Sequence, residues 1–91
     1  MPEAPNTTAP TILLIEDDEV IAEPLIVGLQ DAGFRVLHSV DGKEGLVLAR
    51  NVNPDLLLLD VMLPGLDGFA ICRALRKEST VPILMLTARG Q

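Results

Sequence analysis

The chain has 91 residues, 48% of them hydrophobic, and its 13 acidic against 7 basic side chains give a net charge of −6. This length allows one small domain, and the apolar content excludes a mainly disordered chain. Nucleic-acid phosphates demand clustered Lys and Arg, so the acidic balance excludes direct nucleic-acid binding by this chain. Its apolar runs of about six residues also fall far short of the roughly 20 that span a bilayer.

Residues 1–10 contain three prolines among acidic and polar side chains, with no basic segment followed by an apolar one. This composition is typical of a flexible arm and not of a signal peptide. We therefore expect an N-terminal arm over residues 1–10, a folded domain over residues 11–91, and a cytoplasmic location with no membrane contact.

From residue 11 onward, apolar runs alternate with segments of helical periodicity. Nearly uninterrupted apolar runs predict strands buried on both faces, and the strands are expected at residues 11–15, 34–38, 56–60 and 82–87. Apolar residues at helical spacing predict helices between them, at about residues 20–32, 42–51 and 68–77. This alternation predicts an α/β fold, a parallel sheet with helices on both faces and right-handed crossovers.

Several local signals indicate where helices and turns begin or end. Gly33 followed by Phe34 has the form of a left-handed helix stop with its apolar contact. Pro24 lies too far inside the first helix for a first-turn proline, so we expect a kink or a delayed regular start. Asp41 with Glu44 predicts a capping box, and residues 63–66 predict a type II turn. Asp67 is expected to cap the third helix.

Oxygen-bearing side chains follow three of the predicted strands. Glu16 and Asp17 follow the first strand, Asp60 ends the third, and Thr87 ends the fourth. Parallel strands share one carboxyl edge, where open α/β sheets bind ligands. If the first and third strands are neighbours, the three carboxylates form an acidic pocket that needs a cation, and hard oxygen ligands favour Mg²⁺. One carboxylate could then attack a phosphoryl group, with Thr87 offering its hydroxyl to a phosphoryl oxygen.

Each of these residues also has an ordinary structural interpretation. Acidic residues after a strand are most often helix caps or solvated loop charges, and Asp18 and Glu19 are expected to serve the positive end of the first helix. Thr87 alone could be a strand-end hydroxyl that bonds to backbone. His38 is placed on the second strand, away from the acidic ends, and is not expected to donate a phosphoryl group. The joint position of these residues, together with Pro64-Gly65 and Gly68 after Asp60, favours a site.

Three segments together resemble the signatures of bacterial two-component response-regulator receiver domains, and the resemblance covers residues 11–91. They are IEDDE at residues 15–19, LDVMLPGLDG at residues 59–68 and LTA at residues 86–88. The resemblance implies a flavodoxin-like strand order. The pair Glu16-Asp17 and the sequence LTARG at residues 86–90 are most similar to those of regulators that carry a C-terminal winged-helix DNA-binding domain. This similarity implies transcriptional control.

The same resemblance implies a role for each matching residue. Asp60 would accept a phosphoryl group from a sensor histidine kinase. Asp17 and Asp60 would ligate Mg²⁺ directly, Glu16 through water, and Met62 through its backbone carbonyl. Thr87 would be the switch hydroxyl. Such a module catalyses only its own phosphorylation and dephosphorylation and is not an ordinary enzyme.

The family normally continues through a fourth helix, a fifth strand with a phosphate-contacting lysine, and a fifth helix. The sequence stops at residue 91, so we expect an incomplete fold of four strands and three helices. An apolar fourth strand at the sheet edge would then favour self-association of the chain, either through that strand or through the sheet face that the first helix covers alone. Loss of the lysine would slow phosphorylation or weaken the response to it.

Three other functions compete with this one. An aspartyl-phosphate phosphatase of the haloacid-dehalogenase type needs a second acid two residues after the first, where this chain has Met62. A nucleotide-binding domain needs a Gly-rich phosphate loop after the first strand, and none is present in the sequence. A third alternative is an unphosphorylated interaction fragment that binds a cation and self-associates.

Overall fold

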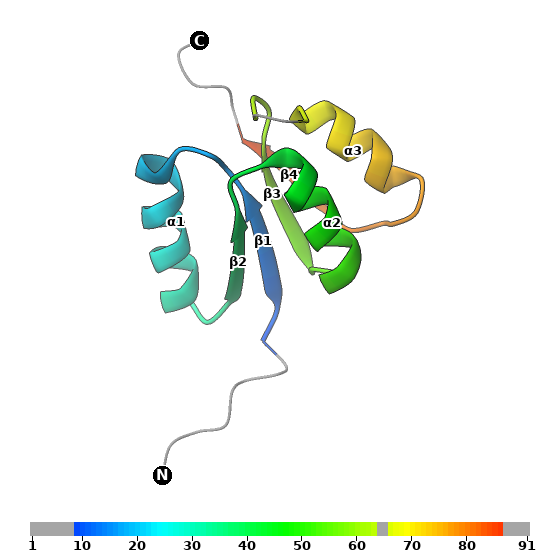
Figure 1. Ribbon diagram of the computed structural model, residues 1–91. Helices are drawn as coiled ribbons and strands as arrows, with labels where there is room; N and C mark the ends of the chain where they lie inside the picture. The colour runs from blue at the N-terminus through cyan, green and yellow to red at the C-terminus, as the bar shows by residue number, and fades with distance from the viewer. Residues whose placement is uncertain (1–8, 64–65, 87–91) are drawn as a thin grey trace.

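The computed structural model describes residues 9–63 and 66–86 (Figure 1). Most of the expected arm, the centre of the turn at residues 63–66, and Thr87 lie outside the described residues. The elements alternate along the chain in the order β1 (Thr11–Ile15), α1 (Glu19–Asp31), β2 (Arg35–Ser39), α2 (Gly42–Val52), β3 (Leu56–Asp60), α3 (Gly68–Arg76) and β4 (Ile83–Leu86). None of the helices in this part of the chain is long and apolar enough to cross a membrane.

The four strands form one parallel sheet in the order β2-β1-β3-β4. In its register Ile15 lies opposite both Ser39 and Leu59, and Asp60 lies opposite Leu86. The expected α/β fold with a flavodoxin-like strand order is confirmed. The order reverses between β1 and β3, so the ends of these two strands flank the position where such sheets bind ligands.

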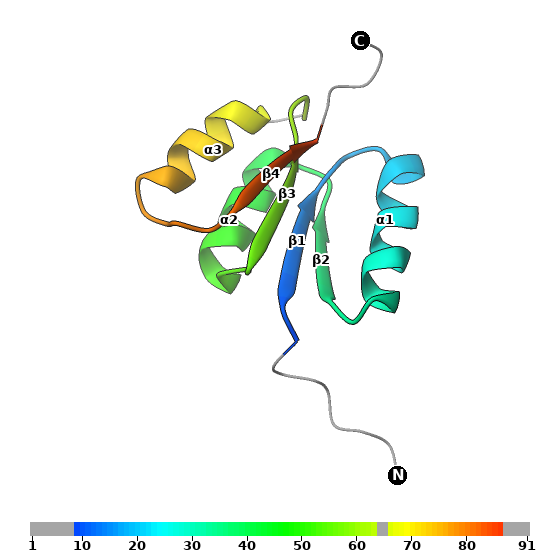
Figure 2. The same ribbon diagram turned by 180° about the vertical axis from the view of Figure 1, so that it is seen from behind.

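Helices cover both faces of the sheet, with α1 on one face and α2 and α3 on the other (Figures 1 and 2). Successive strand residues point to opposite faces, so Leu14 and Leu58 pack on the α1 side while Leu13 and Leu57 pack on the other. All five residues of β1 are buried. Burial on both faces explains why this strand reads as an uninterrupted apolar run.

Each helix begins at an aspartate whose carboxylate accepts a backbone N–H of the first turn. The three pairs are Asp18 with Val20 at 2.9 Å, Asp41 with Glu44 at 3.0 Å, and Asp67 with Ala70 at 2.9 Å. The predicted caps are therefore confirmed. At α2, however, the Asp41 N–H donates to the Ser39 hydroxyl at 3.3 Å, where the capping box predicted the Glu44 side chain.

The first helix ends as its sequence predicts, but it does not start late. Gly33 has φ of 103°, its N–H donates to the Gln30 carbonyl, and the Phe34 N–H donates to the Leu29 carbonyl. These two bonds form a Schellman motif. The helix begins at Glu19 and continues through Pro24, so of the two expected effects of this proline the delayed start is wrong. Pro24 is exposed, and water can therefore satisfy the carbonyl that its missing N–H leaves without a helical partner.

Candidate functional site

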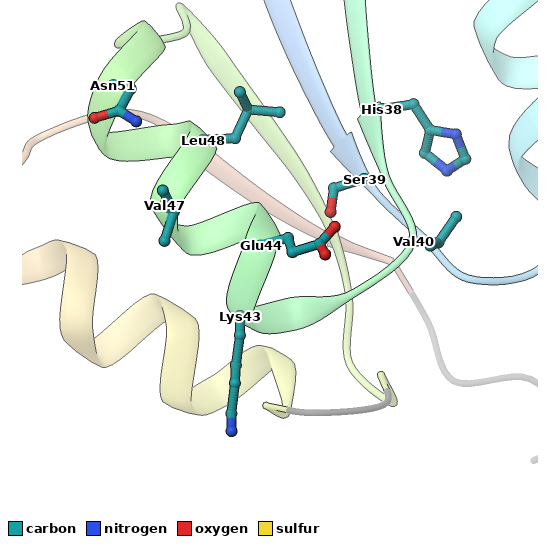
Figure 3. Close-up of a pocket in the computed structure, with 8 residues that line it drawn as sticks. All are labelled: His38, Ser39, Val40, Lys43, Glu44, Val47, Leu48 and Asn51. Carbon is teal, nitrogen blue, oxygen red and sulfur yellow. The ribbon is translucent and has the colours of Figure 1, made fainter.

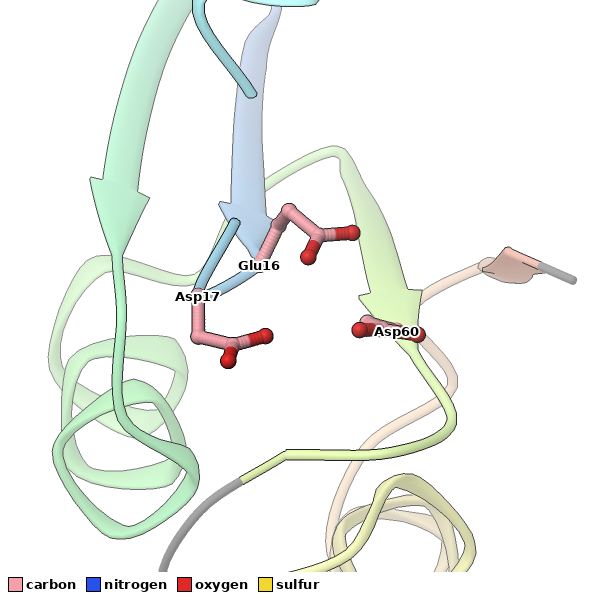
Figure 4. A group of neighbouring side chains, drawn as sticks. All are labelled: Glu16, Asp17 and Asp60. Atoms are coloured by element: carbon pink, nitrogen blue, oxygen red, sulfur yellow. The ribbon is translucent and has the colours of Figure 1, made fainter. Parts of the chain in front are cut away.

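Three carboxylates converge at the carboxyl edge of the sheet. Glu16 and Asp17 follow β1 directly, and Asp60 is the last residue of β3. One carboxylate oxygen from each residue lies within 4.8 Å of the other two, and Figure 4 shows the three side chains pointing toward a common space. The adjacency of β1 and β3 produces this cluster, as the sequence predicts for neighbouring first and third strands.

Two of the three carboxylates are buried at the ends of β1 and β3. Glu16 and Asp60 are each only 1% exposed, whereas Asp17 is more accessible to solvent. Glu16 Oε2 accepts the Asp18 N–H at 3.0 Å, and Asp60 Oδ1 lies 3.4 Å from the Met62 N. Carboxylates this close repel one another, most strongly where water is excluded. A divalent cation would relieve that repulsion, and a set of hard oxygen donors with access to water fits Mg²⁺.

The backbone of Glu16 is held by β2. The Glu16 N–H donates to the Ser39 carbonyl at 3.0 Å, and the Glu16 carbonyl accepts from His38 Nε2 at 2.7 Å. The sequence places His38 on the second strand correctly, but its distance from the acidic ends is overestimated. The missed signal is the pairing register: His38 lies opposite Leu14, only two residues before Glu16.

The start of α3 packs directly against the end of β3. The Gly68 N–H donates to the Val61 carbonyl at 2.9 Å. A Cβ atom on Gly68 would lie 2.5 Å from the Asp60 carbonyl oxygen and 2.9 Å from Val61 Cα. Only glycine allows the helix to approach this closely, so Gly68 helps to hold the backbone that carries Asp60.

A shallow pocket adjoins the carboxylates on the side of the loop that follows β3. Its lining includes Asp17 and Met62, with Phe69 and Arg73 from α3. The side chains of Met62 and Phe69 are 60% and 57% exposed. The loop that carries Met62 therefore borders the acidic cluster, while Thr87, the expected switch hydroxyl, lies outside the described residues.

Comparison with known protein families identifies the chain. The sequence pattern of the family described as response regulator receiver domain matches residues 12–91. The chain belongs to this family. The receiver domain is a signalling module of two-component response regulators and not a classical enzyme.

Curated relatives of this receiver domain are longer proteins. It is 50% identical over 81 residues to the transcriptional regulatory protein AfsQ1 of Streptomyces coelicolor, covering 89% of this chain and 36% of that protein. It is 45% identical over 84 residues to the DNA-binding response regulator MtrA of Mycobacterium tuberculosis, covering 92% of this chain and 37% of that protein. The chain thus spans about a third of the length of these relatives.

Solved structures share the fold of this receiver domain. A putative response regulator from Chloroflexus aurantiacus matches with a TM-score of 0.85 and 40% identity, over 92% of this chain and 71% of that chain. The BeF3-activated receiver domain of RstA from Klebsiella pneumoniae matches with a TM-score of 0.80 and 32% identity, over 87% and 70%.

Proposed function

We propose that this receiver domain accepts a phosphoryl group on Asp60 from a sensor histidine kinase in a Mg²⁺-dependent reaction. The supporting observation is the position of Asp60, which is buried at the end of β3 with one oxygen within 4.8 Å of oxygens of Glu16 and Asp17. In the reaction an Asp60 oxygen attacks phosphorus, the bond from phosphorus to the donor histidine nitrogen breaks, and an acyl phosphate forms. The histidine nitrogen leaves with the electron pair of that bond.

The surrounding residues would divide the remaining tasks. Asp17 and Asp60 would ligate Mg²⁺ directly, Glu16 would bind it through water, and Met62 would contribute its backbone carbonyl. Bound Mg²⁺ supplies neutralisation of the charge on the transferred group. Thr87 would donate its hydroxyl to a phosphoryl oxygen. The module would thus catalyse only gain and loss of its own phosphoryl group.

We further propose that the phosphorylated domain controls transcription through an output domain outside this chain. The relatives named as a transcriptional regulatory protein and a DNA-binding response regulator support this proposal. The chain itself has 13 acidic and 7 basic side chains, which suits a regulatory surface better than a phosphate-backbone contact.

The proposal is tested with a small-molecule phosphodonor such as acetyl phosphate. We expect intact-mass spectrometry to detect addition of one phosphoryl group in the presence of Mg²⁺ and none when EDTA replaces it. A second candidate function is a cation-binding interaction module that is never phosphorylated, which the acidic cluster alone would also support. Metal binding without any adduct, from either the phosphodonor or a kinase, would favour this second function.

Magnesium should stabilise the fold through the acidic cluster. At a free Mg²⁺ concentration ten times the dissociation constant, the free energy of unfolding should rise by about 1.4 kcal/mol. Asp17→Asn should abolish this increase because a direct ligand is lost. Urea unfolding with and without Mg²⁺, followed by circular dichroism, measures the effect, since the chain has no Trp or Tyr.

Asp41→Asn is a matched control for the magnesium experiment. It makes the same change of charge at a helix cap outside the acidic cluster, and asparagine caps helices about as well as aspartate. The increase with Mg²⁺ should persist in this variant. Equal loss of the increase in Asp17→Asn and Asp41→Asn would contradict a localised metal site.

We also propose that the 91-residue chain self-associates through β4. In the described sheet β4 is an edge strand, and Leu84, which lies opposite Leu58 of the α1-side core, is 56% exposed. An apolar edge strand of this kind pairs readily with another chain. Leu84→Lys should therefore shift the chain toward monomer in sedimentation velocity at micromolar concentration.

Val47→Lys is the control for this association. Val47 is similarly exposed, at 54%, but lies on α2. The association should survive this change. A wild-type chain that sediments as a stable monomer would reject self-association, and equal disruption by both lysines would reject β4 as the contact.

A further inference from the structure

His38 makes a contact with the acidic loop that the proposed chemistry does not use. His38 and Ser39 point to opposite sides of β2 (Figure 3). His38 lies on the side of α1, where it lines a groove with Glu19 and Ile26. Its Nε2 atom is 2.7 Å from the Glu16 carbonyl oxygen. A carbonyl only accepts hydrogen bonds, so Nε2 must carry the proton in this contact.

The contact between His38 and the Glu16 carbonyl lies just past the last backbone hydrogen bond between β1 and β2. The Glu16 N–H donates to the Ser39 carbonyl, and in a parallel ladder the next bond would run from the Asp41 N–H to the Glu16 carbonyl. The chain turns away after Ser39 to begin α2, and the Asp41 N–H donates to the Ser39 hydroxyl at 3.3 Å. The His38 ring reaches forward along β2 and donates to that carbonyl.

This hydrogen bond acts on the peptide that joins the two acidic residues. The Glu16 carbonyl and the Asp17 nitrogen belong to one planar unit. The Glu16 N–H belongs to the preceding peptide and is bonded to the Ser39 carbonyl, while the Glu16 carbonyl is bonded to His38. Hydrogen bonds to β2 on both sides of the Glu16 Cα limit rotation there. When the Glu16–Asp17 peptide plane is held in one orientation, the backbone leaves Glu16 in one direction, and this places Asp17 on the side of Asp60.

We infer that His38 is a positioning residue for the metal centre: it presets the Glu16–Asp17 peptide so that the Asp17 carboxylate meets Asp60 around the cation. This role rests on the proposed Mg²⁺ site. Groups that orient metal ligands typically change metal affinity by 10- to 100-fold when they are mutated. His38 acts on the backbone of the loop, so we expect an effect at the lower end, about tenfold.

Two amide substitutions separate hydrogen bonding from simple packing. In His38→Gln the amide nitrogen is as many bonds from Cβ as Nε2 is in histidine, so it can still reach the Glu16 carbonyl. In His38→Asn the amide nitrogen is one bond closer to the backbone and falls short. Both variants replace the ring with a smaller amide side chain, and the two differ from each other by a single methylene.

The probe is Mn²⁺, whose free concentration is read by electron paramagnetic resonance, with Mg²⁺ as competitor. We expect His38→Asn to weaken Mn²⁺ binding about tenfold and His38→Gln to stay within about twofold of wild type. In metal-free protein, amide hydrogen exchange at Asp17 should be faster in His38→Asn and near wild type in His38→Gln. Affinities are expressed per folded molecule, with the folded fraction taken from circular dichroism.

Leu37→Ala is the control for a general loss of stability. Leu37 packs on the opposite side of β2, against the core beneath α2 and α3, so its loss should destabilise the fold and leave Mn²⁺ affinity unchanged. Equal Mn²⁺ affinity in His38→Asn and wild type, or equal weakening in His38→Asn and His38→Gln, would overturn the positioning role of His38. Neither result would count against the metal centre itself. Absence of Mn²⁺ binding by the wild-type chain would instead overturn the metal centre, and the inference with it.

Discussion

Asp60→Asn should eliminate the phosphoryl adduct that the wild-type chain forms with a phosphodonor and Mg²⁺. An amide lacks the anionic oxygen that attacks phosphorus, so the expected loss is complete within detection. The wild-type adduct should be sensitive to hydroxylamine, as an acyl phosphate is. Intact-mass spectrometry over a time course, followed by peptide mapping of the wild-type adduct, measures both properties.

The substitution should not unfold the protein. Asparagine is close to aspartate in size, and it removes one of three mutually repelling carboxylates from a position that is 1% exposed. The unfolding free energy without Mg²⁺ should therefore be no lower than in wild type. Asp41→Asn, which keeps its helix cap, should be phosphorylated normally. An adduct that persists in Asp60→Asn would place the acceptor on another residue.

Gly68→Ala should be the most damaging single-methyl change at the site. The new Cβ would lie 2.5 Å from the Asp60 carbonyl oxygen and 2.9 Å from Val61 Cα. These are backbone atoms that cannot rotate aside, so α3 or the end of β3 must move. We expect a loss of about 2 kcal/mol in unfolding free energy, the middle of the usual cost of overpacking, together with slower phosphorylation because Asp60 shifts.

Gly28→Ala provides a control of opposite sign. A Cβ on Gly28 would have no neighbouring atom within 4 Å, and the residue lies inside α1. Alanine favours the helix there by about 0.5–1 kcal/mol over glycine. Urea unfolding should thus give effects of opposite sign for the two substitutions. Similar changes in unfolding free energy for the two substitutions would show that the close approach of α3 to β3 does not limit the size of residue 68.

The sequence alone determined the elements and the chemical identity of the site. Apolar runs that end in acidic residues predicted β1 and β3, because a strand buried on both faces is built mainly of apolar side chains. Aspartates before the helical segments predicted the helix starts, because their carboxylates satisfy N–H groups within the same turn. These are interactions between residues close in sequence, and the residue types themselves encode them.

Only the tertiary structure decided how distant segments meet. Spacing along the chain does not specify that β1 lies between β2 and β3, yet this order brings Glu16 and Asp60 together. The contact of His38 with the Glu16 carbonyl and the approach of Gly68 to Asp60 depend on the same arrangement. The choice of neighbouring strands and the packing of helices on the sheet arise from many long-range contacts at once, so the pattern of any one segment does not report them. The sequence supplies three carboxylates, and the parallel pairing of β1 with β3 makes them one site.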